Sequence, residues 1–136
     1  MSDLDIRGAL QARLATVVGL PEIAYEGVQF EPPIGTDGDL LPYVVPVIVV
    51  GSERPFDVLG EAVSSQGTFE ISCVYPSNEG TAAVEGMAEA IKAVFVNGTR
   101  LVLGSAVVKI RWAERRQAFF DADYVRVPVS IGWRVN

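Results

Sequence analysis

Four acidic side chains have a spacing that could support chemistry. Asp37 and Asp39 flank Gly38 and could suggest calcium, but the full twelve-residue pattern of a calcium loop is missing. Asp-Gly-Asp is ordinarily turn chemistry. Glu85 and Glu89 stand four residues apart on a predicted helix, outside its apolar stripe. Nothing there would bury one carboxyl group and raise its pKa for acid/base work. We therefore expect neither a metal site nor a catalytic pair of carboxylates.

Candidate nucleophiles lack the partners that would activate them. The chain has no histidine, the side chain most used for proton transfer near neutral pH. Ser64, Ser65 and Ser72 therefore have no histidine to act as a base. Cys73 is the single cysteine and lies in a strand-like run, which favours a buried and inert thiol. Nucleotide-binding glycine loops are also absent. We predict that the chain is not an enzyme and uses no cofactor.

Basic residues form the more informative set. If the final two strands pair as a hairpin, four of them project from the same side of the sheet. The patch could be a solvated face. It could also meet an acidic surface of an identical neighbour and fix the register of a ring. The predicted oligomer interface consists of Lys109, Arg111, Arg126 and Arg134.

Apolar periodicity predicts two amphipathic helices. In residues 3–18 the apolar side chains recur at spacings of four, four and three, and Gly19 and Pro21 end the helix. The second helix spans about residues 81–95, where Gly86 indicates close packing against another backbone. The two apolar stripes consist of Ile6, Leu10, Leu14 and Val17, and of Val84, Met87, Ala88, Ile91 and Phe95.

Alternating and β-branched runs predict the strands. Pro46 suggests that its strand lies at a sheet edge or contains a bulge, because proline donates no ladder hydrogen bond. The clearest alternation runs from Tyr124 to the end of the sequence. The order of elements indicates one α+β domain over residues 1–136, with a largely antiparallel or mixed sheet of four to five strands and two helices packed on one face. The predicted strands are 43–50, 68–75, 106–113, 124–136 and, less regular, 23–30.

Two further segments could contact a partner. Residues 51–67 are long for a hairpin loop and mix charged with apolar side chains. Two adjacent phenylalanines lie between charged runs, where they either need a partner or fold back onto the core. The predicted contact residues are Arg54, Phe56, Asp57, Leu59, Glu61, Phe119 and Phe120.

Composition restricts the possible partners. The 136 residues carry a net charge of −6, which repels phosphate backbones and makes sequence-specific recognition of nucleic acid improbable. The longest apolar stretch, residues 43–50, is far shorter than the roughly 20 residues of a membrane-spanning helix. The N-terminus lacks the features of a secretory signal, so we expect assembly in a cytoplasm.

In this order, the segments resemble the tail terminator proteins of long-tailed bacteriophages over nearly the whole chain. The likeness is one of overall layout. The residues that carry it are 6–10, 23–33, 67–71, the helix 80–91 and the closing run 127–134.

The resemblance implies a structural protein at the head-proximal end of the virion tail, assembled in the host bacterial cytoplasm. It would form a homohexameric ring that binds the end of the completed tail tube, stops its polymerisation and joins the head-tail connector. Genome DNA would pass only transiently, without specific binding. We expect residues 51–67 to be mobile in the free protein and to become ordered on contact with the tube.

Two alternatives remain open at the level of sequence. A head-completion or stopper protein of the same connector would share the size and acidity of this chain. A small-ligand binding module, from a different class, would have a lined pocket between its helices and its sheet and would be a monomer or dimer.

Overall fold

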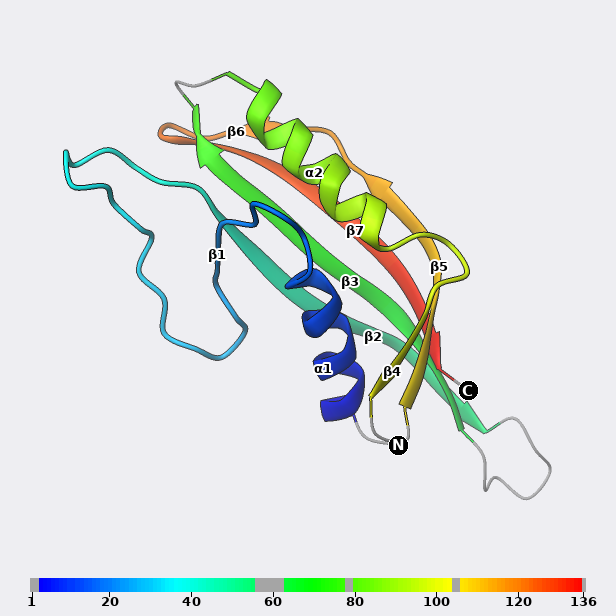
Figure 1. Cartoon of the computed structure of the whole chain (residues 1–136). Coiled ribbons are helices and arrows are strands. Elements are labelled where there is room, and N and C mark those ends of the chain that lie inside the picture. Colours follow the sequence, from blue (N-terminus) through cyan, green and yellow to red (C-terminus); the bar gives the residue numbers. More distant parts are fainter. Residues whose placement is uncertain (1–2, 56–62, 78–79, 104–105, 136) are drawn as a thin grey trace.

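The computed structural model describes residues 3–55, 63–77, 80–103 and 106–135. Two helices lie across one face of a long, twisted sheet (Figure 1). The elements in chain order are α1 (Asp3–Leu14), β1 (Glu22–Ile23), β2 (Tyr43–Pro55), β3 (Val63–Pro76), α2 (Ala82–Val94), β4 (Arg100–Leu103), β5 (Ala106–Arg115), β6 (Phe119–Phe120) and β7 (Tyr124–Val135).

Both helices lie where the apolar periodicity predicts them, and α1 ends earlier than expected, at Leu14. The chain leaves α1 through Gly19, whose φ of 77° is in the left-handed region that favours glycine. The expected close packing at Gly86 is wrong, because a Cβ built there would have no neighbour within 4 Å. The buried residues of the stripes are Ile6, Leu10, Leu14, Val17, Val84, Ala88, Ile91 and Phe95.

The sheet is larger than the sequence indicates. The expectation of four to five strands is wrong, because the described residues form a mixed, mainly antiparallel sheet of seven strands in the order β1-β2-β3-β7-β5-β4, with β6 also paired to β7. The sheet, rather than the helices, dominates the fold. Two of the additional strands, β4 and β6, have only four and two residues, too few for a period to be recognised.

The segment expected to be a long loop is mostly strand. β2 continues to Pro55 and β3 begins at Val63, and the two pair in antiparallel register with one irregularity between Val50 and Ser52. Gly67 lies in this hairpin, and a Cβ built on it would lie 2.0 Å from the backbone oxygen of Val49. Glycine therefore allows a close approach of two strands that the sequence pattern alone presented as a loop.

β7 is the central strand, paired with β3 on one side and with β5 and β6 on the other. Alternate residues from Val125 to Val135 are buried on the face that the helices cover. Pro128 lies between the part of β7 that pairs with β5 and the part that pairs with β6. Its carbonyl oxygen accepts a hydrogen bond from the backbone N–H of Arg116. Proline is tolerated in this central strand because no hydrogen-bond donor is needed at that position.

The core lies between the helices and the inner face of the sheet. Phe69 and Phe95 meet there edge to face, with ring centroids 5.9 Å apart. Large, fully buried side chains fill this space, among them Trp133, Phe69, Phe95, Leu10, Leu14, Ile71 and Ile91. Within the described ranges, no helix has the length and apolarity needed to cross a bilayer. The sheet surface turned away from the helices, called the outer face below, carries the alternate residues of β7 from Tyr124 to Arg134.

Candidate interaction surfaces

A polar chain of three side chains crosses the outer face. Arg116 Nε donates to Ser130 Oγ over 2.7 Å, and Ser130 Oγ donates to Glu70 Oε2 over 2.6 Å. Glu70 and Ser130 are directly opposite each other on β3 and β7. Ser130 is fully buried, so its hydroxyl is hidden beneath the two charged groups that it joins. The arrangement fixes Arg116 over the sheet and leaves this part of the outer face polar.

Trp112 covers the neighbouring part of the outer face. Its indole lies on Gly132, the residue opposite it on β7, and a Cβ built on that glycine would lie 2.2 Å from the indole nitrogen. The indole remains 39% exposed. Because no helix of the described residues covers the outer face, the ring is accessible to a partner (Figure 1).

The predicted pairing of the last two strands is confirmed, and it places the predicted basic residues unevenly. Lys109 and Arg134 are directly opposite each other. Arg111 lies where the register of β5 shifts, and its guanidinium reaches Gln66 Oε1 at 3.4 Å. Arg126 is eight residues away from Arg134, or roughly 26 Å along the strand, and is opposite Phe119. The structure therefore brings three of the four together and separates Arg126 from them.

Sequence reasoning missed a further cation. Arg100 of β4 is opposite Lys109, which is itself opposite Arg134, so three cations occupy one line across adjacent strands. We call these three residues the basic rung. All three are exposed, and none has an ion pair with another described residue. The signal was hidden because β4 is too short to be predicted as a strand.

A hollow of about 450 Å³ lies beside the basic rung. Lys109, Arg111 and Arg134 line it together with the turn at Asn97 and Gly98. The adjacent line of the sheet pairs Val102 with Val107, and Val102 is 69% exposed. This end of the sheet therefore combines cations with exposed aliphatic side chains.

Acidic residues lie near the β6–β7 turn, at the opposite end of β7 from the basic rung. Asp39 and Asp123 line one hollow of about 350 Å³, although they are far apart in the sequence. We call Asp37, Asp39, Asp121 and Asp123 the acidic tip. The backbone N–H of Asp39 donates to the Asp37 carboxylate and holds the pKa of that group below its ordinary value. None of the four forms an ion pair with a described residue.

The predicted contact residues are placed in two regions. Arg54 lies in β2 opposite Ser64. Phe119 and Phe120 form β6 beside the acidic tip, and they are 52% and 63% exposed, so they do not fold back onto the core. As neighbours on one strand they point to opposite faces. The other predicted contact residues, Phe56, Asp57, Leu59 and Glu61, lie outside the described residues.

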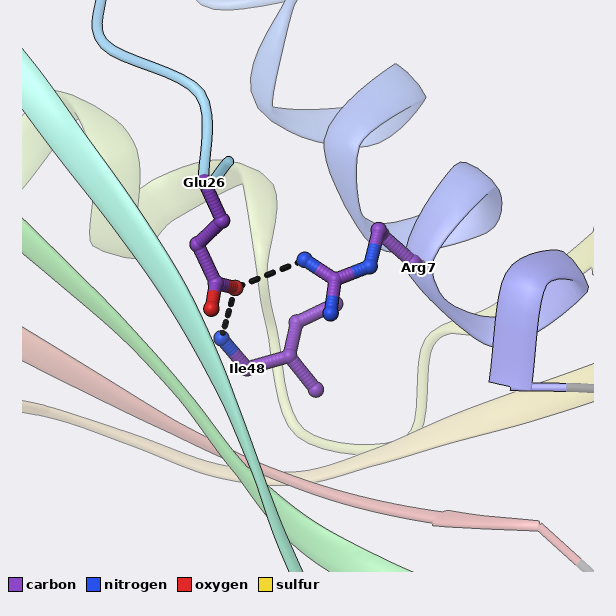
Figure 2. Close-up of polar contacts among 3 residues, drawn as sticks. All are labelled: Arg7, Glu26 and Ile48. Carbon is purple, nitrogen blue, oxygen red and sulfur yellow. Dashed lines mark hydrogen bonds and ion pairs between the residues drawn. The ribbon is translucent and has the colours of Figure 1, made fainter. Parts of the chain in front are cut away.

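A polar clamp joins α1 to the free edge of β2 (Figure 2). One oxygen of Glu26 accepts hydrogen bonds from the Arg7 guanidinium at 2.7 Å and from the backbone N–H of Ile48 at 2.8 Å. Burial opposes ionisation of Glu26, but the hydrogen bond from Ile48 and the charge and hydrogen bond of Arg7 lower its pKa overall. Pro46 is two residues before Ile48 on the same strand, so its backbone nitrogen faces the same edge. No described strand pairs with this edge of β2 at that position, so no hydrogen-bond donor is required there. Pro46 suggested an edge or a bulge. β2 is the second strand of the sheet, but β1 pairs with it only at Tyr43 and Val44, so Pro46 lies on an open part of its edge.

Three of the residues considered for chemistry, Cys73, Glu85 and Glu89, are buried or have structural partners. Burial raises the pKa of the Cys73 thiol to about 12, so the group stays protonated near neutral pH. Glu85 and Glu89 both lie within ion-pair distance of Arg115. Among the described residues, no group of three or more carboxylates and thiols is arranged to hold a metal ion.

Comparisons with known proteins identify a family and a shared fold. The family model of phage tail terminator proteins matches residues 5–133. One solved protein chain superposes with a TM-score of 0.78 at 25% sequence identity, covering 100% of this chain and 96% of the other. A chain from the virion of a native gene transfer agent particle superposes with a TM-score of 0.61 at 23% identity, covering 96% of this chain and 94% of that one, which indicates a shared fold. No curated protein matched. Because the family model spans nearly the whole chain, this protein belongs to the phage tail terminator family and is a structural protein of the virion tail.

Proposed function

We propose that the chain forms a homohexameric ring that binds the end of the completed tail tube, stops further polymerisation and presents a surface to the head-tail connector. The observation that carries this proposal is the match to the tail terminator family over residues 5–133. The sheet supports it, because the helices of the described residues lie on one face and leave the outer face uncovered (Figure 1). The basic rung and the acidic turn after β6 lie at opposite ends of β7. A closed ring requires one patch of each subunit to meet a different patch of the next, and Lys109, Arg111 and Arg134 form one such patch.

The tube contact is proposed for the end of β2 and the sequence that joins it to β3, which include Arg54, Phe56, Asp57, Leu59 and Glu61. Phe119 and Phe120 of β6 lie at the other end of β7 and are proposed to contact a partner chain. Exposed phenylalanine rings lose unfavourable contact with water when a partner covers them. Residues 51–55 and 63–67, part of the expected mobile loop, are strand, and residues 56–62 lie outside the described residues.

Genome DNA is proposed to pass through the ring without being held. Six copies with a net charge of −6 each carry −36 in total. Like-charge repulsion from an acidic ring would keep the DNA backbone from adhering to the bore. Arg126 is opposite Phe119, so it lies at the other end of β7 from the basic rung.

Electron microscopy of gold-labelled chain tests the capping role. Purified tail tubes and DNA-filled heads are incubated separately with the labelled protein. We expect label at one end of each tube and inhibition of further growth when free tube subunits are added. Label on filled heads but not on tubes would instead support a stopper protein, and label on neither would reject both assignments.

A further inference from the structure

The three positive charges of the basic rung repel one another in an isolated chain. Arg100, Lys109 and Arg134 are direct neighbours across three strands, and like charges in that arrangement destabilise a sheet. No described carboxylate lies within ion-pair distance of any of them. A partner with negative charge would remove this repulsion when it binds.

The side chains beside the basic rung indicate what kind of partner this is. Val102 and Val107 are opposite each other on the next line of the sheet, and both are exposed. A nucleic-acid backbone offers phosphate but no apolar cover for these valines. A protein surface that presents carboxylates beside apolar side chains would match both features.

The chain itself carries such a surface. The acidic tip brings Asp39 and Asp123 to one hollow, and Asp121 follows the exposed Phe120 directly in the turn after β6. The two ends are separated by the length of β7, whose 12 residues span roughly 36–40 Å. A chain cannot bring its own acidic tip to its own basic rung, so the two surfaces can meet only between copies.

We propose that the basic rung, with Val102 and Val107, binds the acidic tip of a second copy in a head-to-tail contact. This inference rests on the proposed ring and assigns its subunit interface. Repeating one head-to-tail contact closes a ring when the rotation per step permits it. Exposed charges supply much of the attraction, so the contact weakens as salt is raised from about 0.1 M to 1 M.

Charge reversal at each end of the sheet tests the contact. The quantity measured is the native mass of the particle. Lys109→Glu with Arg134→Glu changes the basic rung, and Asp121→Lys with Asp123→Lys changes the acidic tip. Each double variant is expected to weaken association about 30-fold or more and to yield monomers at concentrations where the unchanged chain is a ring. Lys92→Glu, on the exposed side of α2, reverses a charge elsewhere and is expected to leave the mass unchanged.

An equimolar mixture of the two double variants provides the decisive result. Neither variant can bind itself, but alternating copies restore an attractive contact at every interface. We expect the mixture to recover the mass of the unchanged ring with equal amounts of both chains in native mass spectrometry. Recovery also shows that both variants are folded.

Three outcomes would overturn the inference. They are an unchanged mass in either double variant, a mixture that stays monomeric, and an unchanged chain that forms only a dimer. Tail-length control is scored separately. Variants that keep their mass and still cap tubes would refute this contact alone, whereas a ring that never binds tubes would refute the proposed function alone.

Discussion

Replacing Ser130 with alanine is expected to destabilise the fold by about 2 kcal/mol. The substitution removes the 2.7 Å hydrogen bond from Arg116 and the 2.6 Å hydrogen bond to Glu70. Hydrogen bonds to charged groups contribute roughly 1.5–3 kcal/mol each. Losing both bonds would cost more than losing one. Arg116 is exposed and Glu70 is only partly buried, however, so hydrogen bonds to water replace part of the lost interaction.

Thermal unfolding measures the Ser130→Ala effect. For a chain of this size, 1 kcal/mol corresponds to roughly 3–4 °C, so the expected fall in Tm is about 6–8 °C. Ser72→Ala is the matched control. Ser72 lies on β3, on the same sheet face as Glu70 and Ser130, and makes no side-chain hydrogen bond with a described residue. The control should change Tm by less than about 2 °C. Equal shifts in the two variants would refute the reasoning that Ser130 joins Arg116 to Glu70.

Three further predictions concern Gly132, Glu26 and Cys73. Gly132→Ala is expected to displace the Trp112 indole, with a red-shifted tryptophan emission and a loss of roughly 1–3 kcal/mol, whereas Gly86→Ala, with open space around it, should stabilise the chain by roughly 0.5–1 kcal/mol; similar effects would contradict the packing at Gly132. The lowered pKa of Glu26 means that its ionised form stabilises the fold above the ordinary pKa of 4.5, and this contribution is lost as the pH falls through the lower folded-state pKa. Urea unfolding at pH 6 and pH 3 should therefore show a smaller pH dependence for Glu26→Gln than for the unchanged chain, and identical dependence would reject the clamp. Cys73 should react with a thiol reagent only at the rate of unfolding, since burial raises its pKa to about 12, and rapid labelling of the native protein would contradict that burial.

Long periodic segments were predictable from the sequence, and short ones were not. The apolar stripes at Leu10 and Ile91 and the alternation around Val129 each extend over several periods, so they indicate α1, α2 and β7 by themselves. β4 and β6 depend on pairing with β5 and β7, which no local pattern reveals. The extension of β2 and β3 likewise comes from their mutual pairing through Gly67.

The candidate surfaces were predictable only in part for the same reason. Lys109 and Arg134 could be placed together because the last two strands were expected to pair. Arg100 could not be predicted because β4 is too short to be recognised. Arg126 and Arg134 share a face of the last strand, but a shared face does not mean that two side chains are close along the strand. The acidic tip joins Asp39 to Asp123, which only the folded chain brings to one hollow.

The length of tails assembled without this protein tests the central claim most directly. Phage tails are produced with its gene intact and with its gene deleted, and their lengths are measured by electron microscopy. Capping predicts that deletion gives tubes that grow past the normal length and do not join heads, and that added purified protein restores normal length. Tails of normal length joined to heads in its absence would contradict the account.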